Sequence, residues 1–201
     1  MCSSDLTVAR VRLNEGIPLR EGGRGEGTGD PHVWLDPVLV RERWLPKIVA
    51  ALVEARPDAR DRIEARGRAV GDSLASLDAW MAERLGPVHG GAFVATHSAW
   101  NYLAARYGIR ELGAIYPSPG QEPSSRELAG LVDQARAAGV RAVFTEPQLG
   151  ETGARALAEE LGVPVHVLDP LGGPGLPGRE TYLGMMRFNT DEIASALGVG
   201  R

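Results

Sequence analysis

The sequence predicts an α/β protein, in which a parallel-sheet C-terminal lobe of order βαβαβαβ is joined by a long helix to a partial N-terminal lobe. Short apolar runs alternate with helical patterns between residues 87 and 168, which is typical of a parallel sheet. A long helical pattern over residues 58–86 precedes that alternation. We therefore expect a partial N-terminal lobe at residues 1–57, a linking helix at 58–86 and an α/β lobe at 87–201.

The first part of the chain predicts one strand and two helices. Residues 6–20 alternate partly between apolar and polar side chains, which favours a strand with a turn at Gly16, and the glycine-rich, charged residues 21–29 predict a loop. Apolar residues recur at helical spacing over residues 38–56, and Pro57 closes that helix. The apolar stripe of residues 58–86 is narrow, which indicates a helix that acts as a spacer between two packed lobes.

The second part of the chain predicts alternating strands and helices. Strands are expected at 92–96, 109–116, 140–145 and 163–168, and helices at 99–107, 124–138 and 152–161. Ser124 and Glu127 have the spacing of a capping box, which marks the start of the second of these helices. A glycine- and proline-rich loop at 172–178 then leads to a closing pair of helices at 182–188 and 190–197.

Composition excludes several classes of protein. The 201 residues carry 26 acidic and 22 basic side chains, a net charge of -4, which gives no basic footprint for nucleic acid. No apolar run of about 18 residues predicts a membrane span, and the chain shows no export signal at its start. The single cysteine, Cys2, excludes an internal disulfide and a zinc site built from several cysteines.

The stretch Asp30–Pro37, DPHVWLDP, organises the predicted site. Proline biases the residue before it away from the helical region, so we expect the backbone around His32 to be extended and a helix to begin after Asp36. Asp36 suits the N-cap of that helix and Pro37 its first position. A single histidine is more often a surface or core residue than a ligand, so a site here needs support from other residues.

Polar residues at the ends of three predicted strands supply that support. His97, Glu146 and Asp169 follow the first, third and fourth strands, and ligands bind outside the carboxyl ends of parallel strands. Imidazole and carboxylate groups form a ligand set for zinc, and the set also suits manganese or iron. With His32 approaching from the other side of the long helix, we predict that His32, His97 and Asp169 bind one metal ion. Glu146 either hydrogen-bonds a ligand or holds its loop, and we favour the first.

The remaining histidines and the nearby tryptophans receive structural interpretations. His89 is expected to be an exposed loop residue, and His166, inside the fourth strand, a packed or hydrogen-bonded one. Trp34 and Trp100 lie close in sequence to the two ligand histidines, so we expect them to pack there and keep the site partly dry.

At this point the chain resembles the metal-binding component of zinc and manganese ABC transporters, a family of two-lobed solute-binding proteins with a rigid linking helix. Five stretches carry the resemblance, in the family's order: DPHVWLDP at 30–37, THSAWNYLAARYG at 96–108, EPSSREL at 122–128, FTEPQ at 144–148 and VLDPLG at 167–172. The resemblance implies that His32 and His97 bind the metal and that Asp169 is a further ligand or lies beside the ion. A histidine at His97, where manganese-preferring relatives tend to carry glutamate, implies zinc rather than Mn(II).

The resemblance also implies a cellular role. It predicts a monomer outside the cytoplasm, periplasmic or attached to a membrane, that delivers its ion to an ABC transporter permease; the family is also associated with cell adhesion. In the family, a signal sequence and most of an N-terminal lobe, with a first ligand histidine, precede the part that resembles this chain. Residues 6–20 then correspond to the last strand of that lobe, and an apolar edge is left uncovered. The loop at 21–29, rich in histidine in many zinc-specific relatives, contains none here.

Two other interpretations stay open on the residues alone. In a mononuclear metallohydrolase, Glu146 would act as general base on a water bound by a metal at His32, His97 and Asp169. No nucleophile elbow, phosphate loop or H-E-x-x-H helix supports that hypothesis. In the third interpretation the chain is a truncated product that folds partly and binds no ion tightly.

Overall fold

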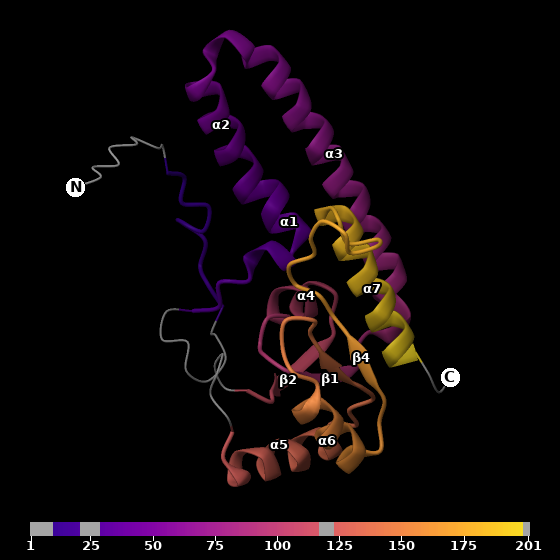
Figure 1. The fold of residues 1–201 in the computed structure, drawn as a ribbon. Coiled ribbons are helices and arrows are strands. Elements are labelled where there is room, and N and C mark those ends of the chain that lie inside the picture. The colour runs from indigo at the N-terminus through magenta and orange to yellow at the C-terminus, as the bar shows by residue number, and fades with distance from the viewer. Residues whose placement is uncertain (1–9, 21–28, 117–122, 199–201) are drawn as a thin grey trace, which may run out of the picture.

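The computed structural model describes residues 10–20, 29–116 and 123–198, and Figure 1 shows their arrangement. The strands are β1 (Ala92–Ala95), β2 (Arg110–Ala114), β3 (Val143–Thr145) and β4 (Val165–Val167). The α-helices are α1 (Pro37–Leu39), α2 (Leu45–Ala55), α3 (Arg60–Leu85), α4 (Asn101–Arg106), α5 (Ser125–Ala137), α6 (Thr152–Leu161) and α7 (Tyr182–Gly198). Short 3-10 turns lie at Val33–Leu35, Pro57–Ala59 and Gly86–Val88, and a π-helical turn lies at Val40–Trp44.

The four strands form one parallel sheet in the order β2-β1-β3-β4. The chain leaves β1 toward one edge to make β2 and returns to the other side of β1 to make β3. The strand order therefore reverses between β1 and β3, and the crevice beyond the carboxyl ends of such a pair is where α/β sheets bind ligands. His97 and Glu146 follow these two strands directly.

Alternate side chains of the sheet enter two separate cores. Phe93, Ala95 and Phe144 pack with buried residues of α3, α4 and α7 on one face. Val94 and Val143 pack with α5 and α6 on the other. Every residue of β1 and β3 is buried, because both faces are covered by helices. The predicted α/β class with a parallel sheet is confirmed.

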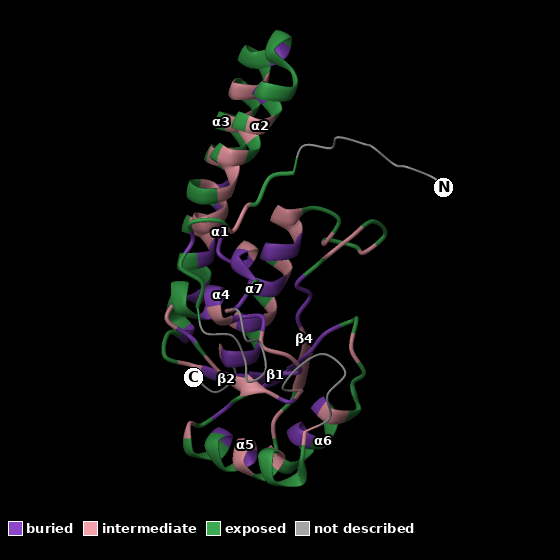
Figure 2. Ribbon diagram, turned by 90° about the vertical axis from the view of Figure 1, so that its left-hand side faces the viewer, coloured by how far each residue is buried: buried purple, intermediate pink, exposed green. Residues whose placement is uncertain are grey.

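The two halves of the long helix α3 have different surroundings. Its C-terminal half packs Leu77, Met81 and Leu85 against the lobe that holds the sheet, and Leu74 is also buried. Its N-terminal half runs beside α2, and Figures 1 and 2 show this helical pair projecting beyond the lobe with a largely exposed surface. Large apolar side chains remain exposed there and near the start of the described chain: Val11, Leu19, Ile48, Leu52 and Val70. No helix in the described part of the chain is both long and apolar enough to cross a membrane.

Two predicted elements are wrong. Among the described residues 10–20 no strand forms, although the turn at Gly16 does, with a φ of 74°; the rest of the predicted strand, residues 6–9, lies outside the described residues. No neighbouring strand is present among the described residues to accept its hydrogen bonds. The predicted closing pair of helices is one continuous helix, α7, because Asn189 and Thr190 are buried within it and Thr190 Oγ1 donates to Met186 O at 2.7 Å. The division at residues 57 and 86 stays a prediction.

The helix predicted over residues 38–56 is interrupted by a π-helical turn. α1 passes into the turn at Val40–Trp44, and α2 begins directly after it, with Pro46 in its first turn. Proline inside an α-helix lacks the N–H donor, and its ring clashes with the carbonyl one turn earlier. The wider turn, closed by Leu45 N–H donating to Val40 O, relieves that clash.

Both predicted helix starts are confirmed. Asp36 Oδ1 accepts from Val38 N at 2.9 Å and from Leu39 N at 3.2 Å, so the segment after His32 is anchored at the start of α1. Ser124 and Glu127 form a reciprocal capping box at the start of α5. The two caps satisfy backbone donors that would otherwise lack partners at these helix ends.

Candidate metal site

His32 is held by the aspartate two residues before it. Asp30 Oδ1 accepts from the His32 backbone N–H at 2.9 Å and lies 2.7 Å from His32 Nδ1. Asp30 is fully buried, and its main-chain carbonyl accepts from Tyr102 Oη at 3.0 Å. The expectation of an extended backbone at His32 is wrong, since its φ of -78° and ψ of 37° lead into the 3-10 turn at Val33–Leu35. The aspartate hydrogen bond to the backbone N–H favours this local turn over an extended chain.

His97 is also held by a carboxylate, which comes from the neighbouring strand end of the sheet. It follows β1, and its Nδ1 lies 2.8 Å from Oε1 of Glu146, which follows β3 and is 3% exposed. The β1–β3 pairing brings these two chain ends side by side. Glu146 therefore contacts a predicted ligand histidine, as the sequence analysis favoured.

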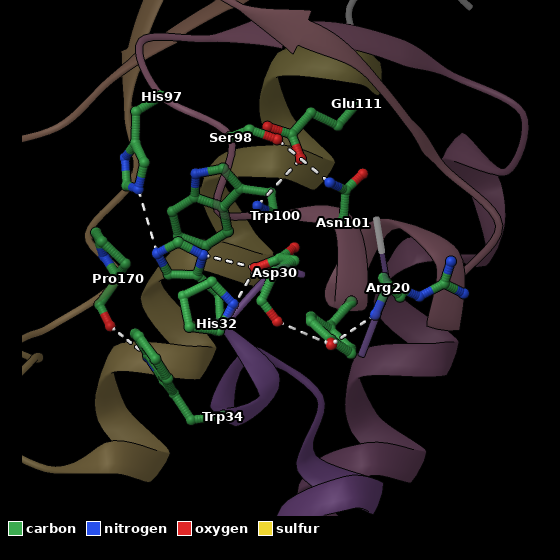
Figure 3. Close-up of polar contacts among 12 residues, drawn as sticks. Arg20, Asp30, His32, Trp34, His97, Ser98, Trp100, Asn101, Glu111 and Pro170 are labelled. Carbon is green, nitrogen blue, oxygen red and sulfur yellow. Dashed lines mark hydrogen bonds and ion pairs between the residues drawn. The ribbon is translucent and has the colours of Figure 1, made fainter. Parts of the chain in front are cut away.

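The two rings meet through their other nitrogens (Figure 3). His97 Nε2 lies 3.2 Å from His32 Nε2, and the ring centroids are 5.0 Å apart in an edge-on arrangement. A carboxylate only accepts hydrogen bonds, so a ring that donates its Nδ1–H to the carboxylate behind it has Nε2 as its metal-binding nitrogen. A proton or a metal cation shared by the two Nε2 atoms would stabilise their close approach.

The separation of the two nitrogens fits a metal ion. Zinc binds imidazole nitrogen at about 2.0–2.1 Å in tetrahedral geometry, which places two such nitrogens about 3.3 Å apart. The observed 3.2 Å is close to that value. A carboxylate behind each imidazole is also the arrangement that fixes the tautomer and raises the basicity of metal-binding histidines.

Buried acidic groups surround this pair. Asp30 Oδ2 and Glu111 Oε1 are buried and have no hydrogen-bond partner among the described residues, while Glu111 Oε2 accepts from Trp100 N at 3.1 Å. Burial, and then the charges of Asp30 and Glu146, raise the pKa of Glu111 to about 8. The charges of Asp30 and Glu146, which contribute to this shift, favour a cation over an anion beside the two rings.

Asp169 lies in a different set of contacts. It is fully buried, and its carboxylate accepts from Gln148 Nε2 and Gly172 N at 3.0 Å each, from Leu171 N at 3.2 Å and from Arg179 Nη1 at 3.0 Å. Burial raises the pKa of Asp169, but these hydrogen bonds and the charge of Arg179 hold it below its ordinary value overall. Among the described residues, no group of three or more His, Cys, Asp or Glu side chains is set to hold a metal ion.

Two short links join Asp169 to the histidine pair. Glu146 and Gln148, separated by one residue, contact His97 and Asp169 respectively. On the other side, Trp34 Nε1 donates to Pro170 O at 2.8 Å, which ties the chain after His32 to the residue after Asp169 (Figure 3). The predicted site residues therefore share one rim of the sheet, with Asp169 held by its own partners.

The other sequence expectations for this region are largely met. His89 is exposed, and His166 Nδ1 lies 3.2 Å from Glu192 Oε2, so it is a hydrogen-bonded histidine. Trp100 is fully buried, and Trp34 is partly buried with its ring beside His32.

Sequence reasoning missed Asp30, Glu111 and Arg179. An acidic residue two positions before a histidine is the pattern of a side chain that bonds the following backbone N–H, so Asp30 carried a readable signal. Glu111 sits on β2 and Arg179 in the loop before α7, and only the fold brings either one to the site.

Comparison with known proteins identifies the class of protein to which this fold belongs. The model of a family described as zinc-uptake complex component A, periplasmic, matches residues 3–196, and the chain belongs to this family. The family consists of solute-binding proteins and not of enzymes, which removes support from the metallohydrolase interpretation.

Individual relatives carry zinc-related names. The chain is 29% identical over 202 aligned positions to the high-affinity zinc uptake system protein ZnuA of Bacillus subtilis, covering 93% of this chain and 63% of that protein. It is 34% identical over 142 positions to the zinc-binding lipoprotein AdcA of Streptococcus pneumoniae, covering 71% of this chain and 28% of that protein. The chain thus spans less than two thirds of the length of these relatives.

Solved structures show the same fold. A crystal structure of ZnuA superposes with a TM-score of 0.80 at 32% identity, covering 92% of this chain and 68% of that one. The laminin-binding protein Lmb of Streptococcus agalactiae, described as bifunctional with adhesin and metal-transporting activity, superposes with a TM-score of 0.84 at 29% identity, covering 98% and 74%.

Proposed function

We propose that this chain captures a divalent metal ion, zinc in preference to manganese, for an ABC transporter. His32 and His97 bind the ion through Nε2, and Asp169 supplies a carboxylate oxygen. The observation that carries the proposal is the 3.2 Å approach of two Nε2 atoms whose rings are each backed by a carboxylate. The zinc-related names of the family and of its relatives support zinc as the ion.

The family also supports a place and a partner for this activity. A periplasmic family description and a lipoprotein relative favour a location outside the cytoplasm, where the chain, as a monomer, passes the ion to a membrane permease. No bond of a substrate is made or broken. Release follows from loosening the contacts that join the His32 segment to the lobe that holds the sheet, such as the hydrogen bond from Trp34 to Pro170.

Calorimetric titration of Zn(II), with Mn(II) in parallel, into the chelator-stripped chain tests the proposal. We expect saturable one-to-one zinc binding that is tighter than manganese binding. His97→Ala removes one of two nitrogen ligands and should weaken zinc binding at least about 100-fold, a size expected for loss of a directly coordinating group.

His89→Ala is the matched control, because it removes an exposed histidine. It should bind zinc like the unmodified chain. Equal zinc affinity in the His97→Ala and His89→Ala variants would show that the ion binds elsewhere, and the proposed site would then be abandoned.

A further inference from the structure

The two oxygens of the Asp169 carboxylate have unequal surroundings. Oδ1 accepts three hydrogen bonds, from the Gln148 side chain and from the backbone N–H groups of Leu171 and Gly172. Oδ2 is contacted by Arg179 Nη1 at 3.0 Å. The three donors to Oδ1 fix the position of the carboxylate, whereas one side chain neutralises Oδ2.

Arg179 is itself incompletely satisfied. Its Nε is buried and has no hydrogen-bond partner among the described residues, and a buried donor without an acceptor costs free energy. Its guanidinium lies 4.6 Å from the ring centroid of Phe188, so the cation has a second favourable contact that does not involve Asp169. The guanidinium therefore has less to lose than the Oδ1 donors if Oδ2 exchanges partners.

The backbone around Arg179 suits such an exchange. Arg179 ends a loop in which Gly172, Gly173, Gly175 and Gly178 all have positive φ, a region that other residues rarely adopt. Three internal backbone hydrogen bonds hold this loop, among them Leu176 N–H to Gly173 O at 3.3 Å and Arg179 N–H to Leu176 O at 2.9 Å. Few hydrogen bonds would have to change for Arg179 to move.

We propose that Arg179 is a displaceable counter-ion of Asp169. In the metal-free chain its guanidinium neutralises Oδ2; when the histidine pair takes up the ion, Oδ2 leaves Arg179 and binds the metal, while Oδ1 keeps its three donors. Arg179 then remains against Phe188, and its return to Oδ2 favours release of the ion. This inference rests on the proposed function, since it concerns the third ligand of the same site.

Zinc titration of Arg179→Met tests the exchange. Methionine keeps an unbranched side chain against Phe188 but removes the competing charge, so we expect zinc to bind about 10-fold tighter, the size of one charge-assisted hydrogen bond. Arg187→Met is the matched control, because Arg187 is an exposed arginine that also stacks on an aromatic ring, that of Trp80, at 4.9 Å. It should change zinc affinity less than about 2-fold.

Hydrogen exchange in the unmodified chain gives an independent measurement, which also serves if Arg179→Met does not fold. Zinc should speed exchange at the N–H groups of Leu176 and Arg179 and leave those of Leu171 and Gly172 protected. Unchanged exchange at all four positions, or zinc affinity in Arg179→Met no tighter than in the unmodified chain, would overturn the inference while zinc binding lost in His97→Ala keeps the proposed function. No zinc binding in the unmodified chain would overturn both.

Discussion

The two halves of the candidate site, around the two histidines and around Asp169, differ in which partners their acidic groups have. Around the histidines, Asp30 Oδ2 and Glu111 Oε1 are buried without a hydrogen-bond partner among the described residues, and the pKa of Glu111 is raised to about 8. Around Asp169, four protein donors surround the carboxylate, and its pKa is lowered. In the histidine half two buried carboxyl oxygens therefore lack a donor, whereas in the aspartate half the protein supplies four donors, one of them the positively charged Arg179.

Under the proposed function, this difference predicts the order in which the two halves contribute to binding the ion. In the proposed function, an ion that enters the histidine half meets two Nε2 atoms that already lie 3.2 Å apart, close to the spacing of zinc ligands. The aspartate half contributes only after an internal partner gives way. The histidine pair is therefore expected to supply most of the affinity, and Asp169 to tune it.

Among the groups that surround the two histidines and Asp169, the carboxylates behind the histidines should show the largest effect. Asp30→Asn or Glu146→Gln keeps the shape and an acceptor oxygen but removes the charge that polarises the ring, so each should weaken zinc binding about 10- to 100-fold. Competition titration against a chelator measures this. Glu83→Gln, a neutralised exposed carboxylate on α3, should have little effect.

A loss of similar size in Glu83→Gln would mean that overall charge, and not the hydrogen bonds to the rings, sets the affinity. Thermal unfolding of each metal-free variant should accompany the titration. A variant that no longer unfolds cooperatively would report on folding and not on the polarisation of the rings.

Local sequence patterns predicted the fold well and the site in part. The capping box at Ser124, the N-cap at Asp36 and the alternation of strands and helices depend on neighbouring residues, and they are confirmed. The strand predicted at residues 6–20, which does not form over the described residues 10–20, depends on a partner strand, which no local pattern supplies. The contact between Asp169 and Arg179 depends on the path of the loop between them, and the contact of Glu111 with the Trp100 backbone N–H depends on how the fold places β2.

The surroundings of Glu111 can be tested in the metal-free chain through the pH dependence of its stability. Its folded-state pKa of about 8 lies above its ordinary value of 4.5, so the folded chain keeps a proton that the unfolded chain loses between these values. The Glu111 contribution to the free energy of unfolding is therefore full below about pH 4.5 and falls as the pH rises to about 8. Glu111→Gln mimics the protonated form and should stabilise the metal-free chain by up to about 4 kcal/mol at pH 8.

Chemical denaturation at pH 5 and pH 8 measures this difference, with Glu83→Gln as the control for removing a carboxylate. Glu111→Gln should resemble the unmodified chain at pH 5 and exceed it at pH 8. An equal stability gain at both values would argue that Glu111 is ionised throughout.

The smallest effect on zinc binding is expected from changing the hydrogen bond that connects the histidine half of the site to the aspartate half. Tyr182 Oη donates to Trp34 O at 2.8 Å, which connects the start of α7, just after Arg179, to the segment of His32. Burial, and then the charge of Asp36, raise the pKa of Tyr182, so the hydroxyl stays a donor at neutral pH. Tyr182→Phe should cost about 1 kcal/mol of unfolding free energy and weaken zinc binding a few-fold, as loss of one neutral hydrogen bond would.

Tyr107→Phe separates stability from binding in this test. Tyr107 Oη donates to Asp78 Oδ1 at 2.9 Å, a contact between the end of α4 and α3. Its loss should lower stability at least as much as Tyr182→Phe, because Asp78 then loses a donor, and it should leave zinc affinity unchanged. If both variants weakened zinc binding equally, the contact at Trp34 would act only through overall stability, and the two halves of the candidate site would bind the ion without being coupled through α7.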